Sequence, residues 1–241
     1  MESTIKSVIW KRYHVEVGKI TLMGGGFYAR AFLVELPCEP KKLVLKLYFM
    51  PGLSRNEYRQ IEVLSKSANL KMPKLYWTEP ARENVKYEVL AMEYLSGLNA
   101  GALVADKLAD KCREKIAEEV VDNLLAYHRT INPTGFGTIG GETFVDDWRF
   151  YYRPIVDSIL EKAKLMLEQG KMYPEALRIM ELAIERYDDI FYLPITEARL
   201  IHGDYNMWNI MVDESAEHAC AVLDPYNCSY ADSEFDLYQL D

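Results

Sequence analysis

The first 95 residues carry short apolar runs separated by Gly, Pro and charged positions, a pattern typical of β-strands joined by turns. The runs cover residues 19–23, 31–36, 43–49 and 87–94. A helix interrupts them, because Ile61 and Leu64 have helical spacing and Pro73 ends the run. Ser54 and Glu57 have the Ser-x-x-Glu spacing of a capping box at its start. We expect a small sheet that carries one helix.

The rest of the chain has mainly helical spacing. A long helix with one apolar face is predicted before Pro133. That face comprises Ile116, Val120, Leu124 and Tyr127. Two more helices are expected to begin near Pro154 and at Pro174, because proline is favoured in the first turn of a helix. Strand character returns only at residues 209–212 and 219–223, which a turn joins into a predicted hairpin.

Together the two patterns predict an α+β fold of two lobes. Residues 1–95 form a small β-rich lobe with one helix, and residues 98–241 form a larger, mainly helical lobe. The chain crosses between the lobes near residues 92–97, which would act as a hinge. A cleft between two such lobes is the natural ligand site.

Composition narrows the function classes. Hydrophobic residues make up 49% and charged residues 27%, and no apolar run approaches the ~20 residues that a membrane helix needs. The first residues lack the order of a signal peptide, so we expect a cytoplasmic protein with no membrane partner. The net charge of −9 argues against nucleic acid as a partner, since that affinity comes mainly from Lys and Arg.

A glycine-rich segment lies between two of the predicted strands. Gly24, Gly25 and Gly26 lack a Cβ, so their backbone can approach a ligand closely. The segment resembles the G-x-G-x-x-G loop that covers the ATP phosphates in kinases, with Ala29 in the last position. The alternative is an ordinary tight hairpin with surplus glycine. A Walker loop does not fit, because no Gly-Lys-Ser/Thr follows.

Lys46 lies within the run LVLKL, which is otherwise apolar on both faces. A buried ammonium needs anionic partners, and ATP phosphates with a helix carboxylate would supply them, as in the Lys–Glu pair of protein kinases. Glu57 is the first choice for that carboxylate, and Glu62 is the alternative. A lysine at the edge of the sheet whose ammonium reaches water is the other interpretation.

The last strand of the first half ends in the sequence LAMEYLSG. Its position predicts a hinge whose backbone donors and acceptors would hold adenine. Glu93 and Leu95 would supply those contacts, and Met92 would line the pocket behind them. By itself this sequence could end any strand, so the prediction depends on its position.

The strongest chemical signal is the sequence HGDYNMWN followed by the strand-like AVLD. Phosphoryl transfer requires a carboxylate to orient and deprotonate the acceptor hydroxyl, and oxygen ligands to hold Mg²⁺ on the phosphates. Asp204 suits the base, and Asn209 and Asp224 suit the metal. The predicted hairpin places Asn209 and Asp224 side by side. We expect His202 to brace the loop through hydrogen bonds rather than to titrate in the reaction.

At these residues the chain resembles the aminoglycoside phosphotransferase superfamily, which includes fructosamine kinases and choline kinases and has a protein-kinase-like fold. Further matching segments are residues 72–75, 92–95 and 232–237. The resemblance implies ATP and Mg²⁺ as cofactors and Asp236 as a structural brace. Family members usually continue with more helix beyond Asp241, which suggests a truncated chain or a reduced helical lobe with part of the acceptor pocket missing.

The expected activity is transfer of the ATP γ-phosphate to a hydroxyl of a small molecule such as an aminoglycoside, ketosamine, amino alcohol or sugar. A protein kinase is the second possibility, and a catalytically silent nucleotide-binding module is the third. From Arg186 onward the chain has twelve acidic and two basic residues. This excess favours a cationic or amine-bearing acceptor, although a solvated acidic surface would explain it equally well.

Overall fold

A five-stranded antiparallel sheet dominates the first half of the chain. The computed structural model describes residues 1–83, 85–103, 107–141 and 143–240. The strands follow the order β1 (Ile20–Gly25), β2 (Ala29–Glu35), β3 (Lys42–Tyr48), β5 (Glu88–Glu93) and β4 (Leu75–Glu79). Four of them coincide with the predicted apolar runs, whereas β4 follows Pro73 and was not predicted. Each neighbouring pair is antiparallel.

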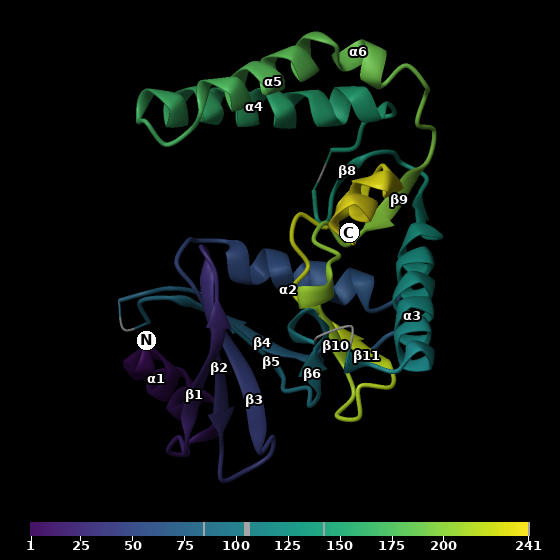
Figure 1. The fold of residues 1–241 in the computed structure, drawn as a ribbon. Coiled ribbons are helices and arrows are strands. Elements are labelled where there is room, and N and C mark those ends of the chain that lie inside the picture. The colour runs from purple at the N-terminus through teal and green to yellow at the C-terminus, as the bar shows by residue number, and fades with distance from the viewer. Residues whose placement is uncertain (84, 104–106, 142, 241) are drawn as a thin grey trace.

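Strand β3 explains how both faces of the sheet are covered. The covering helices are α1 (Glu2–Tyr13) and α2 (Leu53–Leu64). Leu43, Leu45 and Leu47 are fully buried in the cluster that includes the apolar face of α1. Because successive side chains of a strand point to opposite faces, Lys46 and Tyr48 point to the α2 side. Figure 1 shows this half with its two helices.

Helix α1 corrects the prediction of a single helix in this half. Its buried residues Thr4, Ile5, Val8 and Ile9 fill the sheet face opposite α2. Ile5, Val8 and Ile9 have the i, i+3, i+4 spacing of an amphipathic helix, which is the signal that could have revealed it. The exposed Trp10 beside them weakens the contrast between the two faces of the helix.

The start of α2 also differs from the prediction. The helix begins at Leu53, so Ser54 lies inside it and forms no capping box. Instead, the Glu88 carboxylate of β5 accepts hydrogen bonds from the Gly52 amide at 2.8 Å, and from the Ser54 amide at 3.1 Å and hydroxyl at 2.9 Å. A carboxylate at this end compensates the unpaired amides of the first turn. The Glu57 side chain is therefore available for another partner.

The second half is mainly helical around two small sheets, so the α+β prediction is confirmed. Helix α3 (Asp110–His128) carries the predicted apolar face. The sheets are formed by β6 (Leu98–Asn99), β10 (Ile210–Val212) and β11 (Ala219–Val222), and by β7 (Ile131–Asn132), β8 (Gly137–Thr138), β9 (Ala198–Ile201) and β12 (Ser229–Ala231). Short 3₁₀ turns complete this half at Ala100–Ala102, Met207–Asn209 and Ser233–Gln239. Only β10 and β11 were predicted. Strands β6, β7 and β8 have two residues each, which is too short to show alternation.

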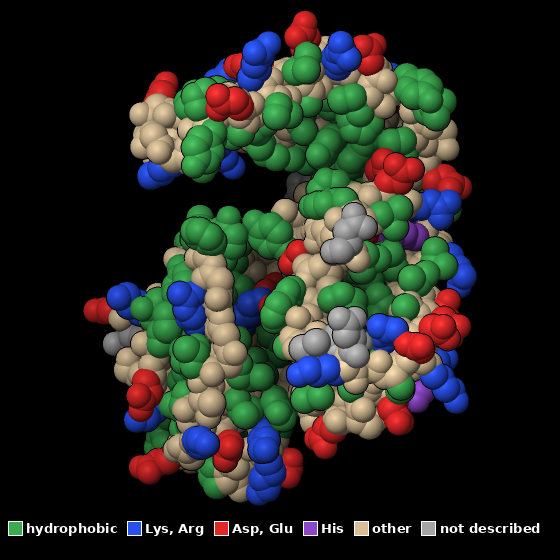
Figure 2. Space-filling view, viewed as in Figure 1, with side chains coloured by type: hydrophobic (Ala, Val, Ile, Leu, Met, Phe, Trp, Pro, Cys, Tyr) green, Lys and Arg blue, Asp and Glu red, His purple; other side chains and the backbone are tan. Residues whose placement is uncertain are grey.

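Two long helices form a hairpin that extends away from the rest of the molecule (Figure 1). They are α4 (Trp148–Glu168) and α5 (Pro174–Glu185), followed by α6 (Tyr187–Ile190). Pro174 begins α5 as predicted, but Pro154 lies inside α4, which starts earlier where the Asp147 carboxylate accepts from the Arg149 amide at 2.9 Å. Figure 2 shows a deep hollow between this hairpin and the sheet half.

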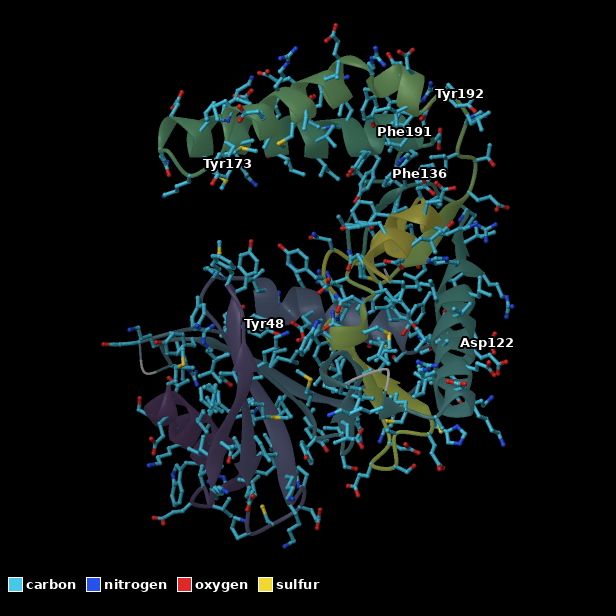
Figure 3. All side chains as sticks on the ribbon, in the orientation of Figure 1. Tyr48, Asp122, Phe136, Tyr173, Phe191 and Tyr192 are labelled. Atoms are coloured by element: carbon cyan, nitrogen blue, oxygen red, sulfur yellow. The ribbon has the colours of Figure 1, made fainter. Side chains whose placement is uncertain are left out.

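Aromatic side chains hold the base of the hairpin. Trp148 stacks on Tyr152 with ring centroids 4.9 Å apart, and Phe136 packs on Trp148 at 5.7 Å. Figure 3 shows Phe136 and Phe191 at this base and Tyr173 at the free end. Tyr173 is 81% exposed. The hairpin is therefore anchored at one end only.

One hydrophobic core joins the two halves. Ile61 and Leu64 of α2 share a buried cluster with Leu124 and Tyr127 of α3 and with Val222 of β11. This shared core holds the sheet half against the helical half, so groups from both halves have fixed positions at their boundary. None of the helices in the described ranges is long and apolar enough to cross a membrane.

We expect Glu79→Gln to lower the free energy of unfolding by about 2 kcal/mol, because a buried charge is lost from its cationic partners. The Glu79 side chain is 4% exposed and lies 2.8 Å from Lys11, 2.6 Å from Arg82 and 3.8 Å from Arg12. Urea denaturation measures the loss. The exposed Glu16→Gln is the control, and an equal effect of both substitutions would contradict the role of Glu79.

Candidate active site

Lys46 and Glu57 form an ion pair beneath the sheet. The Lys46 ammonium donates to both carboxylate oxygens of Glu57, at 2.9 and 2.8 Å. The Tyr48 hydroxyl adds a third hydrogen bond to Glu57 at 2.6 Å, and Figure 3 shows Tyr48 beside α2. Glu62 lies on the exposed face of α2, so Glu57 is the helix carboxylate that reaches Lys46.

Burial and attraction oppose one another at this pair. Burial alone would lower the pKa of Lys46, but attraction to Glu57 and Asp224 and the hydrogen bonds to both outweigh it, so the pKa is raised. Burial raises the pKa of Glu57, and the charge of Lys46 opposes that rise. Lys46 therefore remains an ammonium at neutral pH, and its charge depends on the two carboxylates.

Lys46 also connects the sheet with the helical half. Its ammonium donates to Asp224 Oδ1 at 2.9 Å. The Asp224 side chain is 55% exposed, compared with 15% for Lys46, so the carboxylate is open to the space beside the ion pair. Asp224 has a φ of 51°, which turns the chain directly after β11. Sequence reasoning placed Lys46 and Asp224 on opposite walls of the cleft, and the structure brings them into contact.

The β10–β11 hairpin brings Asn209 next to the Asp224 turn. Ile210 pairs with Val222, and the Leu223 amide donates to the Asn209 carbonyl at 2.8 Å. The Asn209 amide group donates to the backbone carbonyl and to Oδ2 of Asp204, both at 2.8 Å. Asp204, Asn209 and Asp224 therefore lie in one site, as the hairpin prediction required.

Asn206 is a further residue of this site that sequence reasoning did not single out. Its amide group donates to Asp204 Oδ1 at 2.9 Å, while Asn209 holds the other carboxylate oxygen. Its own Oδ1 accepts from the Trp208 amide at 2.9 Å and so caps the 3₁₀ turn. An Asn two residues after the carboxylate is the local spacing that could have indicated it.

Asp236 fixes the backbone of the loop that carries Asp204. Its fully buried carboxylate accepts from the His202 amide at 2.8 Å and from the Gly203 amide at 2.7 Å. Gly203 has a φ of 80°, and a Cβ there would lie 2.1 Å from the Tyr226 carbonyl oxygen, so only glycine fits. The fixed backbone sets the direction of the Asp204 side chain.

His202 is fully buried behind the loop. Its Nε2 lies 3.1 Å from the Leu223 carbonyl, so this nitrogen carries the proton of the neutral ring, and no described residue hydrogen-bonds to Nδ1. Burial lowers the pKa of His202, against the attraction of Asp236 and Asp204. The neutral ring therefore links the loop that bears Asp204 to the backbone of Leu223, the residue before Asp224.

Gly24 and Gly25 belong to the end of β1 rather than to a loop, so the turn to β2 begins at Gly26, and it reaches the other half through an aromatic contact. The Gly26 amide donates to the Ala29 carbonyl at 3.1 Å and closes the turn. The ring of Tyr28 stacks on Tyr226 with centroids 5.8 Å apart and 16° between the planes. Tyr226 follows Asp224 by two residues, so this stack connects the turn to the site. Sequence reasoning did not assign either tyrosine.

The residues of the predicted hinge differ in which of their groups are available to bind a ligand. Met92 is 6% exposed and packs in the shared core near the site. The Glu93 amide donates to the Lys74 carbonyl at 2.8 Å, and its carboxylate binds the Lys71 ammonium, so neither group is free for a ligand. The Leu95 backbone has no hydrogen bond to any described residue. Of the two residues predicted to bind adenine through their backbone, Leu95 is the one whose backbone has no partner among the described residues.

Asn209 and Asp224 have the donor atoms that a magnesium ion requires. Both hydrogens of the Asn209 amide are directed to Asp204, which leaves its Oδ1 as an acceptor without a donor among the described residues. Asp224 adds an exposed carboxylate. No three His, Cys, Asp or Glu side chains in the described ranges could together hold a metal. A pair of oxygen ligands fits Mg²⁺, which takes its other ligands from water and phosphates.

The sequence model of the phosphotransferase enzyme family (APH) matches residues 19–240. The chain belongs to this family. A curated relative, the uncharacterized protein YcbJ of Escherichia coli K12, is 21% identical over 207 residues, which cover 83% of this chain and 66% of the relative. The chain therefore spans slightly less than two thirds of the length of that relative.

Solved structures agree with the family fold. A candidate fructosamine-3-kinase from Thermobifida fusca YX-ER1 superimposes with a TM-score of 0.64 at 20% identity, covering 98% of this chain and 77% of the other. The aminoglycoside phosphotransferase APH(3'')-Id of Streptomyces rimosus, in complex with ADP and streptomycin, gives 0.62 at 14% identity, covering 100% and 82%. At these identities the likeness establishes the fold, which confirms the kinase-like prediction.

We expect acid to destabilise the protein below pH 6.5 partly through His202. The unfolded chain takes up a proton on this histidine near pH 6.5, whereas the lowered pKa keeps the folded ring neutral, so stability falls as the pH falls. His202→Gln should show a flatter decline between pH 7 and 5.5 in urea denaturation.

His218 gives a control of opposite sign. Its hydrogen bond to Glu119 raises its pKa, so it contributes stability below pH 6.5 that is lost as the pH rises. His218→Gln should therefore steepen the decline in acid. An identical pH dependence of wild type and His202→Gln would contradict the neutral, buried state of His202.

Proposed function

We propose that the protein is an ATP-dependent phosphotransferase that transfers the γ-phosphate to a hydroxyl of a small molecule. The observation that carries this proposal is that Asn209 is hydrogen-bonded to Asp204 and lies next to the Asp224 turn, with Lys46 hydrogen-bonded to Asp224. These groups meet the needs of phosphoryl transfer, which are positioning and charge stabilisation. Membership of the phosphotransferase family and the ADP bound to the Streptomyces rimosus relative support the choice of nucleotide.

Each residue has a distinct task in the proposed reaction. Lys46 binds the phosphates while Glu57 keeps its ammonium in place. Gly24, Gly25 and Gly26 cover the phosphates. The Glu93 carbonyl and the Leu95 backbone bind the adenine ring of ATP. Asn209 and Asp224 would hold Mg²⁺, which would neutralise negative charge on the phosphates.

Asp204 acts on the acceptor. Its carboxylate oxygens are oriented by Asn206 and Asn209, which fixes the direction in which it can accept a proton. The acceptor oxygen forms a bond to the γ-phosphorus while the bond to the β–γ bridging oxygen breaks and ADP leaves. The acceptor proton passes to Asp204 and then to water. No covalent bond to the protein is needed.

A protein acceptor fits less well. Only eleven residues separate Asp224 from Asp236, and they form the short strand β12 and the start of a 3₁₀ turn. This leaves no room for the long segment on which protein kinases bind a peptide. A silent module is also disfavoured, because all the expected catalytic groups are present and hydrogen bonds join Asn209 to Asp204 and Lys46 to Asp224.

We expect Asp204→Asn to lower kcat by about 10²- to 10⁴-fold, the contribution of a general base, while the affinity for Mg-ATP changes less than about twofold. ADP release with aminoglycosides, ketosamines, choline-like alcohols and sugars measures turnover, and calorimetry measures nucleotide binding. Glu214→Gln, an exposed carboxylate on the β10–β11 turn, is the control. Unchanged turnover in Asp204→Asn would contradict the assignment of Asp204 as the general base.

Asp224→Asn should raise the Mg²⁺ concentration needed for half-maximal rate by about tenfold or abolish activity, since an anionic oxygen ligand becomes neutral. The measurement is the initial rate as a function of Mg²⁺ at fixed ATP. The same Glu214→Gln variant should keep the wild-type dependence. If both variants respond to Mg²⁺ as the wild type does, Asp224 is not a metal ligand.

A further inference from the structure

A cavity of about 440 Å³ adjoins the candidate active site, within the size range of small-molecule sites. Three elements that carry site residues form its walls. Asn56, Arg59 and Gln60 come from α2, which holds Glu57. Ile201 directly precedes His202, and Asn227 packs on Gly203, where a Cβ would lie 3.0 Å from the Asn227 carbonyl oxygen. A ligand in the cavity would therefore lie next to the loop that bears Asp204.

The wall opposite α2 is aromatic. Trp148, Tyr151 and Tyr152 of α4 and Phe235 line it. Tyr152 stacks on Trp148 at 4.9 Å and contacts the edge of Phe235 at 6.0 Å, so these rings support one another. Such a wall suits the apolar face of a sugar or another ring compound.

The α2 wall is polar and unoccupied by protein partners. The side chains of Asn56, Arg59 and Gln60 form no hydrogen bond or ion pair with any described residue. Arg59 lies over the turn at Gly140, where a Cβ would come within 3.1 Å of its guanidinium. Two amides can bind ligand hydroxyls, and one guanidinium can bind an anion.

Among the described residues that line the cavity, charge has one sign. Arg59 is its only charged residue among the described residues that line it, and no Asp or Glu belongs to that set. A polycation would bring positive charge to Arg59, and no carboxylate of the described lining residues would compensate it. A negatively charged group would instead gain a charge-assisted hydrogen bond.

We propose that the acceptor is a hydroxyl compound with a ring body and a negatively charged group, which Arg59 recognises. The ring lies against Tyr152 and Tyr151, the anion binds Arg59, and a hydroxyl is directed to Asp204. This inference rests on the proposed phosphotransferase function for its reaction, but the binding that it describes can be measured without catalysis.

Four probes share one sugar body and differ in charge. They are glucuronate, with a carboxylate; glucose 6-phosphate, with a phosphate; glucose, which is neutral; and glucosamine, which is cationic. Calorimetric titration of the full chain gives the dissociation constant of each, and ADP release gives kcat and KM separately. We expect the two anions to bind at least about tenfold more tightly than glucosamine, the gain from one charge-assisted contact. Their order distinguishes a carboxylate ligand from a phosphate ligand.

Arg59→Glu tests the residue directly. It should weaken binding of the anionic probes by at least about tenfold and raise their KM with little change in kcat, because the contact lies away from the reacting atoms. Arg59→Lys should restore part of the affinity. Arg55→Glu is the matched control, since Arg55 is an exposed arginine of the same helix outside the cavity, and it should bind the probes as the wild type does.

The results separate the two proposals. Binding of anions that depends on Arg59 without any phosphoryl transfer would overturn the phosphotransferase function and leave the ligand class intact. Tightest binding of glucosamine, unchanged affinity in Arg59→Glu, or binding of none of the four probes would overturn the ligand class.

Discussion

The candidate site depends on the ammonium of Lys46. A charge within an apolar strand is tolerated only because Glu57 and Asp224 both accept hydrogen bonds from it, at 2.8 and 2.9 Å. The first bond fixes α2 to the sheet, and the second fixes the turn after β11. Since α2 carries one wall of the neighbouring cavity, the position of that wall depends on the same ion pair.

In the helical half, the carboxylate of Asp236 fixes the position of a site loop, as the Lys46 ion pair does in the sheet half. Asp236 is fully buried and holds two consecutive amides of the loop that presents Asp204. Because the loop must turn at Gly203, its backbone cannot satisfy these amides within a helix or sheet, so a side chain far along the sequence supplies the acceptor. Two buried carboxylates, Glu57 and Asp236, therefore position the two sides of the site.

The sequence predicted much of this site because its chemistry lies in short, ordered motifs. It was enough to know the spacing of Asp204, Asn209 and Asp224 and the predicted strands around them to expect these residues to lie close together. Contacts between distant segments were beyond its reach. Glu88, which caps α2 from another strand, and Tyr226, which stacks on Tyr28, have no local signal. Helix α1 does have a local signal in the spacing of Ile5, Val8 and Ile9, but its amphipathic pattern is weak, and its apolar face is buried against the sheet.

The distribution of charge is the clearest example of a feature that the sequence alone does not place in space. The acidic excess of the last quarter favoured a cationic acceptor, but a count of carboxylates does not say where they point. Asp213 and Asp232 accept hydrogen bonds from nearby amides, and Glu197 pairs with Arg199. None of the three lines the cavity. Among the described residues that line the cavity, the charged one is Arg59, which belongs to the nearly neutral part of the chain. Selectivity for a ligand follows the few charges that face it, because exposed charges elsewhere are screened within about 10 Å.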